Sequence, residues 1–210
     1  MNISKKIKSN WFVRGFYELY STYFGNCKRK KFGYIADSAL LIPPLKINGS
    51  KNVFLYENTK VENSTISAVL SKFIMKKGSL AGEGLSVHTG NYMQLVGKFF
   101  MTITNEDKLN SNKVFDKDIV VEEDVWIGSN VTLLAGAHLG RSAVIAAGAV
   151  VNSDIPPYCI AGGVPAKPIK FKWTIEQILE HEAALYPEEE RFSRIELENI
   201  FAETKTKVKA

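Results

Sequence analysis

Apolar residues recur at every sixth position in the second half of the chain, in two columns that lie two positions apart. The first column is Val121, Ile127, Leu133, Leu139, Ile145 and Val151, and the second is Ile119, Val125, Val131, Ala137, Ala143 and Ala149. A fixed period of six fits neither an α-helix nor an antiparallel sandwich, and it is typical of a parallel β-helix built from short strands and corners. We therefore predict that the first column points inward and stacks coil on coil.

The same pattern divides the chain into three parts. Residues 1–46 are expected to be an N-terminal helical segment and a linker, because aromatic residues between 3 and 24 fall at helical spacings and Gly and Pro follow. Residues 47–165 are the predicted β-helix, interrupted by a polar excursion at 89–118 that breaks the tiling. Residues 166–210 are the predicted C-terminal helical extension, with capping-box spacings at Thr174/Gln177 and Ser193/Glu196.

Charge is concentrated at the N-terminus, although the composition as a whole is ordinary for a globular protein. Residues 1–31 hold eight Lys or Arg and one Glu, a net charge of +7, whereas the remaining 19 basic and 21 acidic residues leave −2. Basic residues among aromatic ones could rest on an anionic membrane surface, or the aromatic residues could dock short helices onto the body of the protein. We find no nucleic-acid-binding motif. Cys27 and Cys159 lie far apart without a metal-binding pattern, so we expect no zinc site and a cytoplasmic location.

Three sequence segments together resemble one known family. They are Val-Trp-Ile-Gly-Ser-Asn at 125–130, Pro-Pro-Tyr at 156–158 and Gly-Val-Pro-Ala-Lys-Pro-Ile at 163–169. In combination they are similar to the hexapeptide-repeat acyltransferases, in particular the sugar O-acetyltransferases related to maltose and galactoside acetyltransferase. The resemblance implies a left-handed parallel β-helix, acetyl-CoA as the donor, and a homotrimer with active sites between subunits.

The resemblance also assigns roles to individual residues. It implies that Gly128, Ser129 and Ala147 lie along the pantetheine arm of the cofactor, where small side chains allow close approach. Lys167 and Lys170 follow the Val-Pro segment, where relatives often place basic residues that meet the CoA phosphates. For Trp126, which is expected to point outward, we predict a subunit interface or a platform for the substrate.

The general base is the main departure from the family pattern. Relatives carry the motif Thr-Gly-(Asp or Asn)-His, whereas this chain reads Thr-Gly-Asn-Tyr at 89–92. Acyl transfer needs a group that takes the proton of the acceptor, and a histidine suits that task at neutral pH. Three alternatives stay open: His88 acts as the base, Tyr92 takes its place, or the protein binds CoA without turnover.

The predicted function is acetyl-CoA-dependent O-acetylation of a sugar, in surface polysaccharide assembly. Asn91, Glu106 and Asp107 are candidates for binding the sugar, because they lie in or beside the excursion. N-acetylation of an amino sugar or an antibiotic is the alternative reaction, and a catalytically impaired trimeric module is the alternative outside enzymes. We expect no metal, and we expect His138 and His181 to be solvated.

Overall fold

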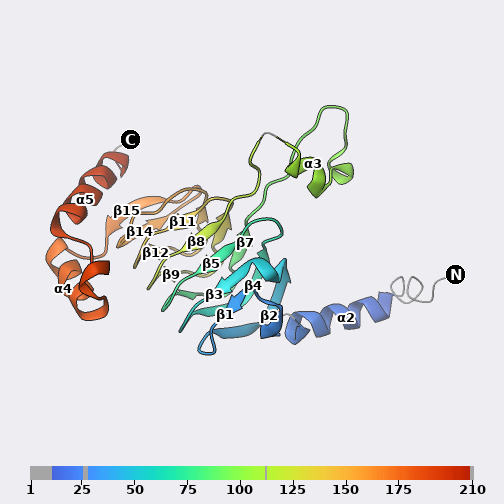
Figure 1. The fold of residues 1–210 in the computed structure, drawn as a ribbon, viewed down its shortest axis with the longest axis horizontal. Coiled ribbons are helices and arrows are strands. Elements are labelled where there is room, and N and C mark those ends of the chain that lie inside the picture. The colour runs from blue at the N-terminus through green and yellow to red at the C-terminus, as the bar shows by residue number, and fades with distance from the viewer. Residues whose placement is uncertain (1–10, 26–27, 112, 209–210) are drawn as a thin grey trace.

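A computed structural model describes residues 11–25, 28–111 and 113–208 (Figure 1). The body is a parallel β-solenoid with helices at both ends of the chain, which confirms the predicted class. The left-handed sense of the winding stays a prediction. Within the described part of the chain, we find no helix long and apolar enough to cross a membrane.

Stacked strands form the walls of the solenoid. A five-stranded sheet contains β1 (Tyr34–Ile35), β3 (Val53–Leu55), β5 (Phe73–Met75), β8 (Ile119–Val121) and β11 (His138–Leu139). A second sheet begins with the long strands β2 (Leu40–Asn48) and β4 (Lys60–Ser67), and β4 divides to pair with two columns of strands. One column is β6 (Leu80–Ala81), β9 (Trp126–Ile127), β12 (Val144–Ile145) and β14 (Cys159–Gly162); the other is β7 (Ser86–His88), β10 (Thr132–Leu134) and β13 (Val150–Val151).

Both apolar columns predicted from the sequence lie inside the solenoid. All twelve residues are buried, and they belong to one continuous core with residues of the earlier coils. The register explains why the sixfold pattern is clear only in the second half. Val53 pairs with Phe73, twenty positions later, whereas Val121 pairs with Leu139, eighteen positions later, so only the later coil consists of three exact hexapeptides.

The corners of the coils use left-handed backbone conformations. Asn58, Gly78, Asp124, Ser142 and Tyr158 all have positive φ and follow one another from coil to coil at the same corner. Asp124 and Ser142 come three positions after the inward residues Val121 and Leu139. Asn, Asp and Gly are the residues that adopt this conformation most readily, which accounts for their presence here.

The solenoid begins earlier than we predicted. Strand β1 and most of β2 lie within the residues that we expected to be a linker, and the two strands pair with β3 and β4 in the parallel ladder. The linker prediction was therefore wrong from Tyr34 onward. Helix α2 (Trp11–Tyr23) precedes the ladder and agrees with the expected helix, while the expected residues 3–10 lie outside the described chain.

The excursion at 89–118 leaves the solenoid between β7 and β8 and projects from it (Figure 1). It contains a 3₁₀ turn at Phe100–Thr102 and the short helix α3 (Asn105–Leu109). The coil that holds it takes 46 positions from Phe73 to its partner Ile119. The ladder resumes in register afterwards, so the insertion leaves the stacking unchanged.

The C-terminal extension begins with a strand that we did not predict. Strand β15 (Lys167–Phe171) runs antiparallel to β14, and α4 (Ile175–Leu185), a 3₁₀ turn at Glu188–Glu190 and α5 (Arg194–Val208) follow. Both predicted capping boxes form, at Thr174 with Gln177 and at Ser193 with Glu196. A second apolar core of Tyr158, Ile178 and Leu197 attaches these helices to the end of the solenoid.

Candidate functional site

A cavity of about 510 Å³ lies where the excursion leaves the end of β7. Three residues that we singled out from the sequence, His88, Asn91 and Tyr92, line it together. Residues of the excursion and of the neighbouring coils complete the wall; among them are Asn48, Ser67, Thr104, Asn105, Lys108 and Asp116. The cavity is therefore lined by the segment 89–92, in which the chain departs from the family motif.

The Thr-Gly-Asn segment fixes how the excursion leaves the solenoid. Thr89 is buried, and its hydroxyl donates to the carbonyl oxygen of Ser71 at 3.1 Å. Gly90 pairs with Asp116 across an isolated bridge, and a Cβ atom at Gly90 would lie 1.9 Å from the Asp116 Oδ1 atom. A side chain at position 90 would therefore have to displace the Asp116 carboxylate, which lies directly against Gly90.

An ion pair inside the excursion forms another part of the wall. Lys108 Nζ lies 3.1 Å from Asp116 Oδ2, and both side chains are largely shielded from solvent. Sequence reasoning missed this pair because the two residues lie eight positions apart in a segment without periodicity. The pair connects α3 to the strand that returns to the solenoid, and it places a charge of each sign at the cavity.

His88 is half-buried at the end of β7, between Ser67 and Leu134 of the neighbouring coils. Its Nε2 atom lies 2.9 Å from the Ser86 hydroxyl oxygen. The Ser86 hydroxyl can donate to or accept from this atom, so the contact orients the ring and leaves the Nδ1 atom for a different partner. Tyr92, by contrast, is 82% exposed. Of the two predicted catalytic residues, His88 is the one held by the solenoid.

Glu106 and Asp107 lie on α3, and neither is among the residues that line the cavity. The Asp107 carboxylate accepts hydrogen bonds from Lys98 and from Thr104 at the start of the helix, and these contacts lower its pKa to about 2. Asp107 thus forms a capping box that stabilises α3. The contact of either residue with sugar hydroxyls stays a prediction.

The predicted cofactor residues meet at a different corner of the solenoid. Gly128 lies against the next coil so closely that a Cβ atom there would be 2.7 Å from the Ala147 backbone nitrogen. The Gly148 amide donates to the Ser129 carbonyl oxygen at 2.9 Å, so Ser129 and Ala147 follow one another along the same edge. Small side chains on successive coils leave the backbone accessible to a ligand that runs parallel to the solenoid axis.

Two exposed lysines continue this edge. Strand β15 pairs Lys167 with Gly162 and Lys170 with Ile160, and the Gly162 and Ile160 positions stack directly on the coil that contains Ala146 and Val144. The structure therefore brings Lys167 to the end of the small-residue corner, as the cofactor prediction requires. Trp126, which is 55% exposed, lies on the outer side of β9 between Leu80 and Val144, away from the His88 cavity.

The cavity and the small-residue corner lie at opposite edges of one wall. His88 pairs with Leu134 at the end of β10, whereas Ser129 precedes the start of that strand by three positions. Strand β10 lies between the two places, because the turn at 129–130 comes before the strand and the His88 partner is at its end. A single chain thus holds the two halves of the predicted site apart.

We expected the other two histidines to be solvated, which is confirmed for His138, an exposed residue, and wrong for His181. His138 Nε2 lies 3.1 Å from Glu122 Oε1, and this hydrogen bond raises the pKa of His138. His181 packs against the rings of Tyr158 and Trp173, so it is half-buried at the base of the C-terminal helices. Among the described residues, no group of three or more His, Cys, Asp or Glu is arranged to hold a metal ion.

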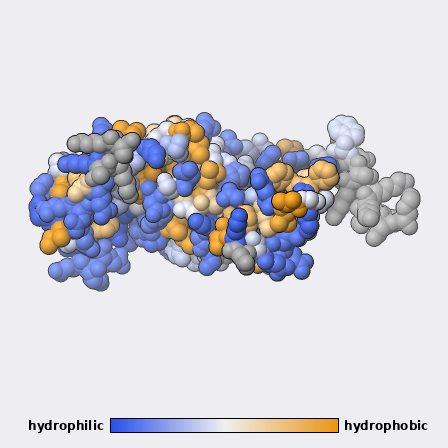
Figure 2. Space-filling model, turned by 90° about the horizontal axis from the view of Figure 1, so that it is seen from above, coloured by the Kyte–Doolittle hydropathy of each residue, from blue (hydrophilic) through white to orange (hydrophobic). Residues whose placement is uncertain are grey.

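The excursion presents apolar side chains to solvent on the side of the molecule that Figure 2 shows, where hydrophobic patches lie between polar ones. The exposed large apolar residues of this segment are Tyr92, Val96, Phe99, Phe100, Met101, Leu109 and Val114. Exposed apolar residues gathered on one projecting segment are typical of surfaces that contact another chain.

Comparison with known proteins identifies the repeat. The family model described as bacterial transferase hexapeptide (six repeats) matches residues 118–153. A chloramphenicol acetyltransferase of Escherichia coli is 35% identical over 105 residues, which cover 48% of this chain and 50% of that protein. The chain spans only 30% to 67% of the length of the first curated relatives that it matches.

Solved structures share the fold. A hexapeptide-repeat acetyltransferase of Vibrio cholerae in complex with acetyl-coenzyme A superimposes with a TM-score of 0.61 at 21% identity, covering 83% of this chain and 100% of that one. A galactoside acetyltransferase in complex with coenzyme A gives a TM-score of 0.60 at 19% identity, covering 92% and 99%.

Proposed function

We propose that this chain, whose residues 118–153 match the bacterial transferase hexapeptide repeat, is an acetyltransferase that moves the acetyl group of acetyl-CoA to a hydroxyl group of a saccharide. The observation that carries the proposal is the corner at Gly128, Ser129 and Ala147, which ends at Lys167. It offers accessible backbone for the pantetheine arm and a positive charge for the phosphates. Structures of the same fold have been solved with coenzyme A or acetyl-coenzyme A, which supports the choice of donor.

The site is completed by a neighbouring copy of the chain in a homotrimer. The separation of His88 from the Ser129 edge supports this, because each half of the site then meets the other half on an adjacent subunit. The exposed apolar residues of the excursion support it as well, since packing against another subunit would remove them from water. A closed cyclic arrangement repeats the same contact in each pair of subunits.

The reaction is a direct transfer. The acceptor oxygen bonds to the thioester carbonyl carbon while its proton passes to a ring nitrogen of His88. The carbon–sulfur bond then breaks, and the CoA sulfur leaves with a proton returned from the histidine. His88 is the base in this proposal because it lines the cavity and is held by Ser86, whereas Tyr92 is largely exposed. An unperturbed tyrosine is also a poor base at neutral pH.

Release of the CoA thiol from acetyl-CoA tests the activity, with matched panels of sugar hydroxyl and amine acceptors. His88→Ala is expected to lower the turnover number at least a hundredfold, the usual contribution of a general base. Tyr92→Phe is the control and should retain most of the activity. Faster turnover with amines would replace the proposed reaction by N-acetylation.

A second candidate function is a trimeric CoA-binding module without turnover, which the exposed Tyr92 at the motif's histidine position favours. It would be identified by CoA binding in calorimetry with no thiol release for any acceptor. Gain of turnover in Tyr92→His would then assign the base to that position instead of His88.

A further inference from the structure

Helix α2 is amphipathic, and its two sides differ sharply in chemistry. At 3.6 residues per turn, Phe12, Phe16, Leu19, Tyr20 and Tyr23 share one side. The opposite side carries the polar residues Arg14, Glu18, Ser21 and Thr22, together with Trp11 and, at its border, Tyr17. In a helix of a globular protein, the apolar side ordinarily packs on the core and the polar side meets water.

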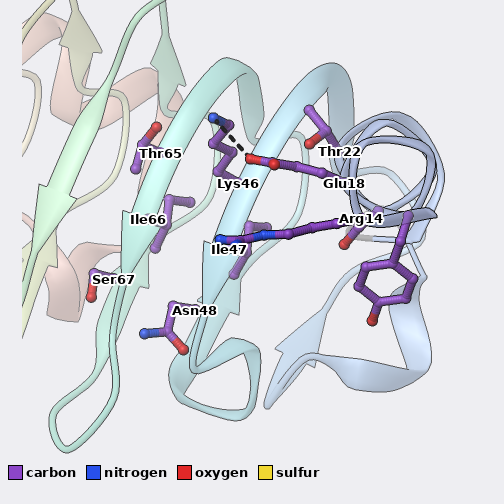
Figure 3. Close-up of a pocket in the computed structure, with 11 residues that line it drawn as sticks. Arg14, Glu18, Thr22, Lys46, Ile47, Asn48, Thr65, Ile66 and Ser67 are labelled. Atoms are coloured by element: carbon purple, nitrogen blue, oxygen red, sulfur yellow. Dashed lines mark ion pairs between the residues drawn. The ribbon is translucent and has the colours of Figure 1, made fainter. Parts of the chain in front are cut away.

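Here the polar side faces the body of the protein (Figure 3). Glu18 Oε1 lies 3.8 Å from Lys46 Nζ on β2, and Thr22 is the buried residue of the helix. A cavity of about 370 Å³ separates this side from β2, and Arg14, Glu18 and Thr22 line it together with Lys46. Tyr17, Ile47 and Ile66 also line this open pocket, so α2 rests on β2 through a mixture of polar and apolar side chains without filling the space between them.

The apolar side is left facing solvent. Phe16 is 68% exposed and Leu19 is 57% exposed, and Tyr20 and Phe24 are exposed as well. The helix extends from the end of the solenoid where the ladder begins, beyond its walls (Figure 1). This arrangement is the reverse of what burial in the chain's own core would produce.

Positive charge lies beside this apolar side. Lys28 Nζ is 5.7 Å from the centre of the Tyr20 ring, and the Tyr20 and Phe24 rings stack at 5.9 Å. Arg29 donates hydrogen bonds to carbonyl oxygens of the first coil, at 2.7 Å for Ala39, which holds the basic segment 28–31 next to the helix. The first 31 residues carry a net charge of +7, while the rest of the chain carries −2.

We propose that the aromatic side of α2 and the basic segment 28–31 together bind the surface of an anionic lipid bilayer. An apolar side rich in Phe and Tyr enters the boundary between head groups and acyl chains, and the adjacent lysines meet the lipid phosphates. The charge favours a bilayer over a second copy of this chain, because the corresponding surface of another copy would carry the same positive charge. The proposal is independent of the acetyl transfer proposed above.

Vesicle flotation of the full chain tests the proposal directly. The probes are vesicles of phosphatidylcholine alone and vesicles of equal parts phosphatidylcholine and phosphatidylglycerol. We expect binding to the anionic vesicles at least about tenfold stronger than to the neutral ones, and weaker binding as salt is added. The double variant Phe16→Asp/Leu19→Asp should reduce partitioning by about tenfold for each side chain. Leu185→Asp/Ile195→Asp removes two exposed apolar residues from α4 and α5 instead, and it should bind as the unmodified chain does.

Three outcomes would overturn the proposal. The first is equal or absent binding to the two kinds of vesicle. The second is binding by the α2 variant that equals that of the α4/α5 control. The third is a combination of two results: the unmodified chain does not bind vesicles, and the α2 variant has a lower molar mass than the unmodified chain in light scattering. This combination would assign the aromatic side of α2 to contact between copies of the chain. Circular dichroism of both double variants checks that each is folded, and both substitute exposed positions.

Discussion

Glu182 on α4 should be among the most sensitive positions for attachment of the C-terminal helices. Its side chain is fully buried, and its carboxylate has partners from two parts of the chain. Arg141 of the solenoid donates through Nη1 at 2.8 Å, the Tyr158 hydroxyl donates as well, and the Phe192 amide lies at 3.3 Å. We consider the substitution Glu182→Ala, which removes all three acceptor contacts together.

The magnitude follows from what the substitution leaves behind. Breaking a buried ion pair by removing one partner costs about 3–5 kcal/mol. Arg141 keeps some compensation, because it also contacts the Glu190 carbonyl oxygen at 2.9 Å and lies over the Tyr186 ring at 4.0 Å. We therefore expect the lower end, about 3 kcal/mol. Glu182→Gln keeps an acceptor for the Tyr158 hydroxyl and should cost less, about 2 kcal/mol.

Native-state hydrogen exchange of the α4 and α5 amides is the suitable measurement, because the loss concerns the opening of one region rather than of the whole solenoid. A loss of about 3 kcal/mol corresponds to exchange roughly a hundredfold faster. Glu180→Ala, an exposed glutamate of the same helix, is the control and should change little. Exchange in Glu182→Ala that is less than about fivefold faster would refute the reasoning.

Three further substitutions probe other parts of the molecule. Gly90→Ala should displace Asp116 and destabilise the excursion by about 1–3 kcal/mol, measured by urea unfolding, and an unchanged midpoint would contradict the close packing. His138 should titrate in NMR above its ordinary pKa of 6.5, and Glu122→Gln should lower that pKa. The raised pKa of His138 means that the contact stabilises the fold below about pH 6.5 and loses this effect as the pH rises through the raised value. The lowered pKa of Glu122, about 2, means that its contacts stabilise the fold above about pH 4.5 and that this stability is lost as the pH falls toward 2. A His138 pKa unaffected by Glu122→Gln would exclude the pair as the cause. Lys167→Ala should weaken CoA binding in calorimetry about fivefold while leaving pantetheine binding unchanged, and an equal loss for both ligands would remove Lys167 from phosphate binding.

The inward residues of the solenoid were predictable because burial repeats with the coil. Where a coil is three hexapeptides long, as from Val121 to Leu139, the pattern is visible in the sequence. Coils of twenty residues place Val53 and Phe73 in the same column, but the extra residues hide the period, and the first two strands were predicted as a linker. The six-residue period therefore identifies the inward residues only in coils that are built from exact hexapeptides.

The candidate site was predictable only in part, for a physical reason that differs between its halves. The Gly128 and Ala147 corner belongs to the repeat, so its residues stack wherever the coils stack. The cavity at His88 depends on the Lys108–Asp116 pair, which arises from the folding of a segment without any period. The sequence left two alternatives open for the aromatic side of α2, toward the body of the protein or away from it, because helical spacing defines a side without saying what it faces.

The reversal of direction at β15 determines how long the solenoid can grow. A parallel ladder has no intrinsic limit, since each coil presents to the next the same row of amides and carbonyls, and another molecule could in principle continue it as a filament. Strand β15 runs against β14, and the second core of Tyr158, Ile178 and Leu197 holds α4 and α5 at that end. An incoming coil would meet a strand of opposite polarity at this wall, so β15 and the helices that follow it block continuation of the ladder there.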